Sequence, residues 1–251
     1  MTGVKLALVA VNTMPEPRQI VADNLARVQD RIHAAAQAAG RDPTNIRLVA
    51  VSKYIDAATA ALLVDAGCAT LGESRPQQLW EKAAAPALAG VHWHLVGRLQ
   101  RNKVRRTLPL VELIHSVDSE RLLATVDETA AALSLAPRVL LEINGSGEAD
   151  KQGFSAEDVR CLLAELPTFL NVRVAGLMTM AALEGGERVA HANFAALRQL
   201  RDELAWVAPP GVELRELSMG MSGDFEAGIA EGATIVRIGS SLFEGLPNRL
   251  S

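Results

Sequence analysis

The chain of 251 residues contains little cysteine, few aromatic residues and no long apolar run. Its two cysteines, Cys68 and Cys161, lie far apart with no second ligand nearby, which argues against a disulfide framework and against a zinc site. Since no segment approaches the ~20 apolar residues of a transmembrane helix, no membrane span is expected. The net charge of -4 gives no reason to expect a nucleic-acid partner. These absences indicate a soluble, cytoplasmic globular protein.

Residues 1–17 are predicted to form an N-terminal extension, disordered in part, ahead of a single domain over residues 18–251. The opening MTGVKLALVAV has one lysine and an apolar run at the short end of the range for a signal peptide. No small-x-small cleavage site precedes Pro15. We therefore interpret this stretch as an extension and not as a signal peptide.

Apolar runs alternate with amphipathic stretches along the rest of the chain, after a first predicted helix at 18–40. The predicted strands are 46–52, 69–72, 91–97, 111–117, 138–144, 172–178, 213–218 and 233–238. The helices between and after them are predicted at 56–66, 75–85, 100–107, 119–134, 155–165, 187–206, 223–231 and from 240. Strict alternation predicts a parallel sheet, and eight units predict a closed (β/α)8 TIM-type barrel. A doubly wound open sheet is the alternative.

A Val-rich run, Arg47–Tyr54, delivers a lysine at the carboxyl end of the first predicted strand, where barrels carry their working groups. Side chains alternate along a strand, so Lys53 is predicted to share the inward face with Val49 and Val51. A buried ammonium is costly unless it is paired or neutral, and a neutral lysine forms a Schiff base with an aldehyde. A surface lysine just past the strand end is the alternative interpretation.

The last two units carry small residues where backbone N–H groups can approach an anion. Ser218–Asp224 (SMGMSGD) ends the seventh strand and opens a helix, with Ser222 as its predicted N-cap. Ile235–Ser241 (IVRIGSS) ends the eighth strand and opens a short helix at Gly239–Ser240. These loops are the usual phosphate site of a barrel. Ordinary glycine turns with serine caps are the alternative. Asp224 and Glu226, in the first turn of the following helix, would repel an anion unless their side chains point away from it.

Arg237 stands in the middle of an apolar run, where a guanidinium needs a partner. A structural ion pair with a barrel carboxylate is one interpretation, and a hydrogen bond to the ring nitrogen of a ligand is the other. Lys53, the phosphate loops and Arg237 at one barrel mouth together indicate pyridoxal 5'-phosphate. This cofactor needs a Schiff-base lysine, an anion site and a partner for its pyridine nitrogen. A charged arginine leaves that nitrogen unprotonated, which weakens carbanion chemistry.

Other candidates are less specific. His94 is a possible ligand contact or a core histidine satisfied by the backbone. The basic segment 97–106 lacks interleaved aromatic residues, so it is interpreted as a solvated helix face without a nucleic-acid role. Met178 is expected to pack the barrel mouth.

Several short motifs follow one another along the chain. They are Val51-Ser-Lys53, Gly72-Glu73, His94-Leu-Val-Gly-Arg-Leu-Gln-Arg-Asn-Lys103, Gly176-Leu-Met178, Ser218-Met-Gly-Met-Ser-Gly-Asp224 and Val236-Arg-Ile-Gly239. Together they resemble the pyridoxal phosphate homeostasis proteins, single-domain relatives of bacterial alanine racemase. The resemblance spans about residues 18–245, nearly the whole chain.

The resemblance implies that Lys53 carries the Schiff base and that Arg237 faces the pyridine nitrogen. The residues that would hold the phosphate or shape its pocket are Ser222, Gly239, Ser240, Met219, Gly220 and Met221. His94, Met178 and Ser74 complete the predicted site. This chain has Ser74 where the family usually has asparagine, so a contact attributed to that amide is not expected here.

The function implied by the resemblance is cofactor supply or homeostasis, without catalytic turnover. A two-base racemase needs a second acid or base opposite the lysine, and related racemases bring a tyrosine from an added β-domain. The only tyrosine, Tyr54, is predicted on the opposite face of the strand from Lys53. An amino-acid racemase or related pyridoxal phosphate enzyme, with His94 or water as second base, is the alternative. A monomer is expected, with pyridoxal phosphate-requiring enzymes as candidate transient clients.

Overall fold

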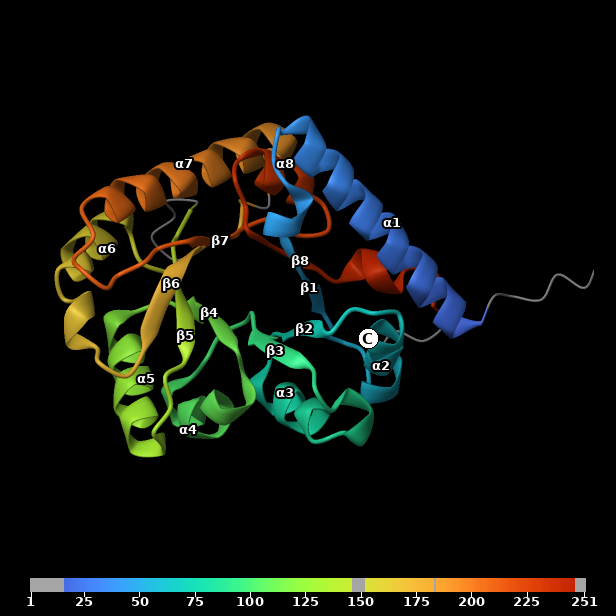
Figure 1. Ribbon diagram of the computed structural model, residues 1–251, viewed down its shortest axis with the longest axis horizontal. Helices are drawn as coiled ribbons and strands as arrows, with labels where there is room; N and C mark the ends of the chain where they lie inside the picture. Colours follow the sequence, from blue (N-terminus) through green and yellow to red (C-terminus); the bar gives the residue numbers. More distant parts are fainter. Residues whose placement is uncertain (1–15, 146–151, 183, 247–251) are drawn as a thin grey trace, which may run out of the picture.

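Eight parallel strands close into a barrel in the order β1 to β8, as the computed structural model shows for residues 16–145, 152–182 and 184–246 (Figure 1). The strands are β1 (Arg47–Val51), β2 (Thr70–Glu73), β3 (His92–Leu95), β4 (Leu113–Val117), β5 (Arg138–Glu142), β6 (Arg173–Met178), β7 (Glu216–Ser218) and β8 (Ile235–Ile238). Closure is direct, because β8 pairs with β1 from Arg47↔Ile235 to Ala50↔Ile238. The predicted (β/α)8 barrel is confirmed, and the open sheet is excluded.

The helices form an outer ring around the strands. They are α1 (Pro17–Ala38), α2 (Ala57–Asp65), α3 (Pro76–Ala83), α4 (Val104–Thr107), α5 (Glu120–Leu133), α6 (Ala156–Leu163), α7 (Gly186–Trp206) and α8 (Phe225–Ala230), with a 3-10 turn, η6, at Ser240–Phe243. The predicted basic helix at 100–107 is in fact a 3-10 turn at Arg101–Lys103 followed by α4. Residues 1–15, most of the predicted extension, lie outside the described residues.

Helix α1 covers the side of the barrel where β8 meets β1. Its buried residues follow helical spacing at Val21, Leu25, Val28 and Ile32, so one stripe faces the protein. The side-chain amide of Asn24 donates to the backbone oxygens of Leu242 and Glu244, which ties the amino-terminal helix to η6. This contact joins the two ends of the described chain.

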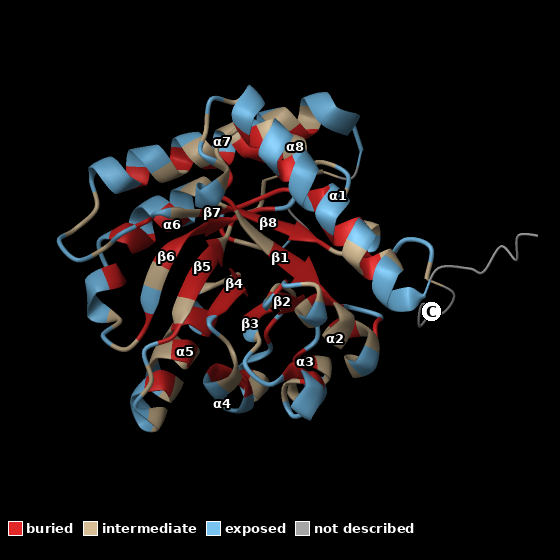
Figure 2. Ribbon diagram, turned by 45° about the vertical axis from the view of Figure 1, so that its right-hand side comes forward, coloured by how far each residue is buried: buried red, intermediate tan, exposed pale blue. Residues whose placement is uncertain are grey.

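The strands are buried on both faces (Figure 2). Inside the barrel lies a small apolar cluster of Val49, Leu113, Leu140, Ala175, Met178 and Ile235. A larger core fills the layer between the strands and the helices. Because parallel strands of this kind need apolar residues on both faces, they read as continuous hydrophobic runs in the sequence. In the described part of the chain, no helix is both long and apolar enough to cross a bilayer.

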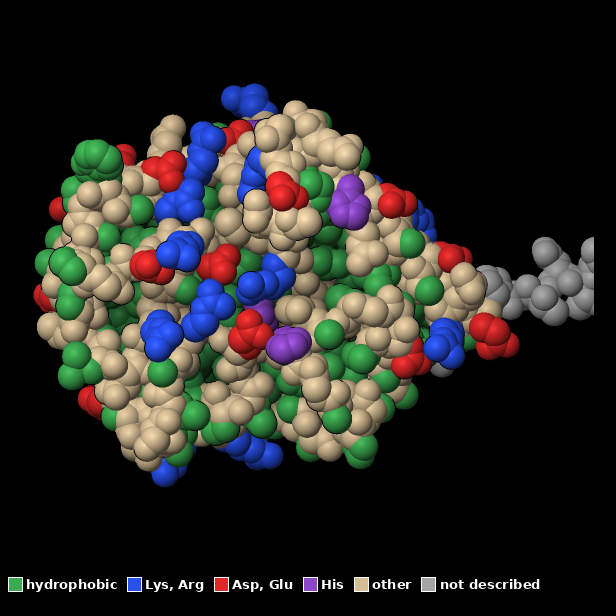
Figure 3. Space-filling view, in the orientation of Figure 1, with side chains coloured by type: hydrophobic (Ala, Val, Ile, Leu, Met, Phe, Trp, Pro, Cys, Tyr) green, Lys and Arg blue, Asp and Glu red, His purple; other side chains and the backbone are tan. Residues whose placement is uncertain are grey.

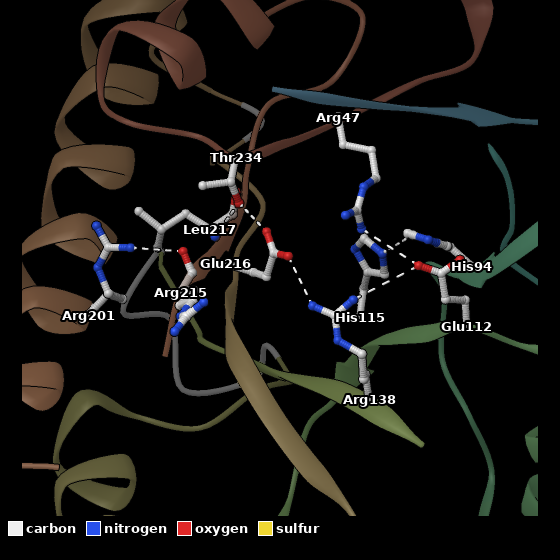
Figure 4. Close-up of polar contacts among 10 residues, drawn as sticks. All are labelled: Arg47, His94, Glu112, His115, Arg138, Arg201, Arg215, Glu216, Leu217 and Thr234. Carbon is white, nitrogen blue, oxygen red and sulfur yellow. Dashed lines mark hydrogen bonds and ion pairs between the residues drawn. The ribbon is translucent and has the colours of Figure 1, made fainter. Parts of the chain in front are cut away.

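Charged side chains form a network at the amino ends of the strands. Arg138 of β5 pairs with Glu216 of β7 at 3.0 Å and approaches Glu112, which also contacts Arg47 (Figure 4). Glu112 contacts His92 as well, at 3.0 Å. Lys and Arg side chains mix with Asp and Glu side chains across the middle of the face shown in Figure 3. Glu112 and Glu216 therefore each pair with at least one arginine at this end of the barrel.

Candidate functional site

Lys53 lies in a tight turn just beyond β1. The strand ends at Val51, and the N–H of Ile55 donates to the Ser52 carbonyl at 3.2 Å to close the turn. Tyr54 has a φ of 65°, in the left-handed region that costs a non-glycine residue strain energy. Lys53 is exposed, so its predicted burial on the inward face is wrong. The strand ends at Val51, two residues before Lys53, so the inward–outward alternation of β1 does not determine where the Lys53 side chain points.

Tyr54 does not lie on the opposite side from Lys53. The Lys53 Nζ stands 5.7 Å from the centre of the Tyr54 ring, and the guanidinium of Arg75 lies 5.8 Å from the same ring. The prediction of opposite faces assumed a continuing strand and is wrong for the same reason as the burial of Lys53. The only tyrosine of the chain thus stands on the side of Lys53.

A buried ion pair lies directly behind this turn. Lys82 reaches inward from α3, and its Nζ donates to the Glu73 carboxylate and to the Ser52 carbonyl, each at 2.6 Å. Both side chains are almost fully buried. The other carboxylate oxygen of Glu73 accepts the N–H of Ser74 at 2.8 Å. The end of β1, the end of β2 and α3 are therefore joined through one polar centre.

The loops after β7 and β8 are joined by a hydrogen bond from the N–H of Gly239 to the Ser222 hydroxyl, at 3.3 Å. The prediction that Ser222 is the N-cap of α8 is wrong, because Asp224 occupies that position. The Asp224 carboxylate accepts the N–H of Met221, and the Glu226 carboxylate pairs with Arg31 of α1. Both acidic side chains are thus engaged with other groups.

Two glycines make these loops compact. A Cβ on Gly239 would lie 3.1 Å from the Val51 oxygen, so this loop touches the end of β1 just before the Lys53 turn. Gly220 has a φ of 95°, and its Cβ would lie 2.8 Å from the Cα of Phe225. A side chain at either position would crowd these backbone atoms, so the close approach depends on the absence of a Cβ.

Arg237 projects into the barrel interior and is almost fully buried. Its Nη1 donates to the Ser218 hydroxyl at 2.5 Å, and its Nη2 donates to the Thr179 carbonyl at 2.9 Å. These two bonds use two of the five N–H donors of a guanidinium. Burial lowers the pKa of Arg237 to about 10, while Asp224 and Glu142 act in the opposite direction. Arg237 therefore remains charged at neutral pH, without a direct carboxylate partner among the described residues.

Two histidines extend this network across the barrel. The Nδ1 of His115 lies 2.8 Å from the Ser218 hydroxyl, and its Nε2 lies 2.9 Å from Nδ1 of His94. Burial lowers the pKa of His94 to about 3 and that of His115 well below its ordinary value, with neighbouring positive charges adding to the effect. Both rings are therefore neutral near pH 7. His94 is a core histidine bonded to a side chain and not to the backbone.

Acid is expected to destabilise the fold through these histidines. The unfolded chain takes up protons below a pKa of ~6.5, whereas folded His94 does so only near pH 3, so the free energy of unfolding falls as pH drops through this window. Between pH 7 and pH 5 we expect wild type to lose about 2 kcal/mol more than His94→Gln. Denaturant unfolding at both pH values measures this, with exposed His33→Gln as the control. Equal losses in wild type and His94→Gln would contradict the assignment.

Comparison with known proteins identifies the family. The sequence matches the family described as alanine racemase, N-terminal domain, over residues 24–247. It is 40% identical over 223 residues to the pyridoxal phosphate homeostasis protein of Pseudomonas aeruginosa, covering 89% of this chain and 94% of the relative. The chain belongs to the pyridoxal phosphate homeostasis protein family.

Other members of the family agree closely in sequence and structure. The pyridoxal phosphate homeostasis protein of Aquifex aeolicus is 40% identical over 222 residues, covering 88% of this chain and 96% of the relative. Among solved structures, PipY of Synechococcus elongatus with pyridoxal phosphate bound is 35% identical, with a TM-score of 0.78. That alignment covers 89% of this chain and 99% of PipY.

The residues present fit the cofactor of the family name. Lys53 offers an exposed amine, Arg237 offers a buried cation with further N–H donors, and the loops after β7 and β8 bring the Ser222 hydroxyl and the Gly239 N–H together. The β1–β8 pairing brings these three positions to neighbouring strands, since Gly239 contacts the end of β1. The donor set is that expected for a phosphorylated aldehyde.

The remaining predicted residues lie at varying distances from this centre. Ser74 packs against the next loop, because a Cβ on Gly97 would lie 2.3 Å from the Ser74 oxygen. Met178 is buried in the apolar cluster inside the barrel. His94 is separated from Arg237 by His115 and Ser218. Direct contact of Ser74, Met178 or His94 with a ligand stays a prediction.

Sequence reasoning missed Lys82 and the histidine–serine contact. A local signal existed for Lys82, because it lies three residues after Leu79 on the buried stripe of α3. No local signal joins His115 to Ser218, which are 103 positions apart. Strand alternation places both side chains inside the barrel but does not say which ones meet.

A cavity of about 660 Å³ lies at the amino ends of β5, β6 and β7. Arg138, Arg173 and Arg215 line it together with apolar residues. It is at the opposite end of the barrel from Lys53, and barrel active sites sit at the carboxyl ends of the strands. Since Arg138 pairs with Glu216 and Arg215 with Glu213, we assign no ligand to this cavity.

Proposed function

We propose that the protein binds pyridoxal 5'-phosphate covalently through Lys53 and serves the homeostasis of this cofactor, without catalytic turnover. The single observation that carries the proposal is the meeting of Arg237, the Ser222–Gly239 loops and the Lys53 turn at one end of the barrel. The bound cofactor of PipY supports it. When bound, such a cofactor supplies a reactive aldehyde, which the protein keeps from unwanted amines.

Each residue has a distinct role in this proposal. Lys53 holds the aldehyde carbon, and Arg237 donates a hydrogen bond to the pyridine nitrogen. Ser222, Gly239 and Ser240 hold the phosphate through hydroxyl and backbone N–H groups. Ser218 and Thr179 orient the guanidinium through the bonds described above.

The charge on Arg237 supports binding without turnover. A guanidinium keeps its proton near neutral pH, so it donates a hydrogen bond without protonating the pyridine nitrogen. An unprotonated ring withdraws electrons weakly, which disfavours the carbanion chemistry of racemases and transaminases. The protein therefore holds the cofactor in a form suited to storage and release.

The positions of the candidate second bases support the same conclusion. A two-base racemase needs a second group on the side opposite the lysine, whereas the Tyr54 ring lies on the side of Lys53. The other candidate, His94, is fully buried and bonded to His115. Neither placement suits proton transfer to a substrate carbon across from Lys53.

We further propose that the protein acts in the cytoplasm as a monomer and passes cofactor to client enzymes that require it. Large apolar side chains are exposed at few positions of the described chain, with Trp206 and Val207 as the only adjacent pair among them. This pattern supports a monomer, because stable dimer interfaces bury contiguous apolar area.

The binding proposal is tested by adding pyridoxal phosphate to the purified chain and recording the visible absorption spectrum. We expect a new band, distinct from that of the free aldehyde, that saturates at one equivalent per chain. A spectrum equal to the sum of protein and free cofactor would contradict the proposal. The phosphate loops would then require another ligand.

The absence of turnover is tested in deuterium oxide. With single amino-acid enantiomers, we expect deuterium at the α-carbon to accumulate no faster than with free pyridoxal phosphate. Mass spectrometry of the recovered amino acids measures the exchange, and protein-free cofactor at the same concentration is the control. Exchange well above that rate, with inversion of configuration, would establish a racemase instead.

A further inference from the structure

Lys82 and Glu73 occupy a position from which they control the backbone of Lys53. Nζ of Lys82 donates to the Ser52 carbonyl at 2.6 Å, and that carbonyl belongs to the peptide bond joining Ser52 to Lys53. The same carbonyl accepts the N–H of Ile55, which closes the turn. The orientation of one peptide plane therefore depends on a buried ammonium that comes from α3.

The ammonium of Lys82 is fully engaged in this place. Its three N–H donors reach the Ser52 carbonyl at 2.6 Å, the Ser52 hydroxyl at 3.3 Å and the Glu73 carboxylate at 2.6 Å. The Ser52 hydroxyl also donates to Glu73 at 3.2 Å, and Glu73 accepts the N–H of Ser74. Charge-assisted hydrogen bonds of this kind are short and directional, so the group holds a single geometry.

A gain in folding stability does not by itself explain the buried pair of Lys82 and Glu73. Burying two charges costs desolvation energy, and apolar residues of similar volume are often as stable or more stable. The adjacent turn, by contrast, needs an external restraint, because Tyr54 adopts a φ of 65°. Strained conformations persist only where their surroundings determine them, and here Lys82 holds the residue two positions earlier.

We infer that Lys82, paired with Glu73, is a positioning residue that orients the Ser52–Ile55 turn so that Lys53 can reach the cofactor aldehyde. This inference rests on the proposed function of Lys53. Lys82 itself forms no bond to the cofactor, since it is buried behind β1 and β2. Its contribution is to the covalent bond at Lys53 and not to the phosphate loops, which stand on β7 and β8.

The test compares two ligands on the full chain. Pyridoxine 5'-phosphate has an alcohol in place of the aldehyde, so it measures the non-covalent pocket alone. The ratio of its Kd to the Kd of pyridoxal phosphate measures the covalent contribution of Lys53. In Lys82→Met/Glu73→Gln, which removes both charges with similar side-chain volumes, we expect this ratio to fall at least about tenfold. The Kd of pyridoxine phosphate should stay within about twofold.

The matched control removes an ion pair at the other end of the barrel. Arg138→Met/Glu216→Gln should leave the ratio unchanged, even where its Tm falls. If Lys82→Met/Glu73→Gln does not fold, Lys82→Met alone is used. Failure of both variants to fold would make the pair purely structural and overturn the inference.

The outcomes for the inference and for the proposed function are distinguishable. A wild-type chain that forms no covalent adduct overturns the proposed function, and the inference falls with it. A wild-type adduct together with an unchanged ratio in Lys82→Met/Glu73→Gln overturns only the positioning role. A lower Tm with an unchanged ratio likewise overturns the positioning role alone, because a merely structural pair would affect both ligands equally.

Discussion

Lys53→Ala is expected to abolish the covalent adduct with pyridoxal phosphate and to weaken its binding by at least about two orders of magnitude. The substitution removes the amine, while Arg237 and the loops at Ser222 and Gly239 stay in place. Because Lys53 is exposed in its turn, its side chain contributes little to the core, so the variant should fold normally. Visible absorption and equilibrium dialysis measure the two effects.

The control for this variant is Lys103→Ala, which removes another lysine of the carboxyl-end loops. We expect it to retain the absorption band and to bind pyridoxal phosphate within about threefold of wild type. Pyridoxine phosphate should bind Lys53→Ala as it binds wild type, because the non-covalent contacts remain. If Lys53→Ala binds pyridoxal phosphate normally, the barrel is a non-covalent phosphate-binding protein and the Schiff-base assignment is wrong.

Gly176→Ala is expected to lower the free energy of unfolding by at least about 4 kcal/mol, more than any other substitution proposed for this chain. A Cβ at Gly176 would lie 2.0 Å from the Glu216 oxygen and 2.7 Å from two further backbone atoms of that residue. Gly176 and Glu216 are register partners on β6 and β7, so neither can retreat without breaking the pairing of these two strands. Denaturant unfolding measures the loss.

Gly223→Ala is the matched control, since no atom lies within 4 Å of the Cβ that it would add. We expect its free energy of unfolding to stay within about 0.5 kcal/mol of wild type. Equal stabilities for Gly176→Ala and Gly223→Ala would mean that β6 and β7 do not approach as closely as described. The packing of this side of the barrel would then need revision.

The barrel could be predicted from sequence because both faces of its strands are buried. Runs such as residues 48–51 are apolar throughout, and each strand from β1 to β7 is followed by a helix. One predicted site residue stood out for a similar reason. Arg237 interrupts an apolar run, and a charged residue there requires a partner.

The details of the site could not be predicted, because they depend on turns and on contacts between distant residues. The strand pattern does not say that β1 stops at Val51, so it placed Lys53 inside the barrel and Tyr54 opposite. The N-cap of α8 depends on a loop conformation in which Ser222 bonds to Gly239 instead. The approach of Lys82 to Ser52 depends on how α3 packs, which local propensity does not determine.

The most direct test of the Schiff-base assignment is to reduce the wild-type chain with borohydride after adding pyridoxal phosphate, and to map the modified peptide. Reduction makes the bond between the aldehyde carbon and its amine permanent. We predict a single stoichiometric pyridoxyl group on Lys53 and none above background on Lys82 or Lys103. A label on another lysine, or no stoichiometric label, would contradict the assignment of Lys53 and the function proposed for this barrel.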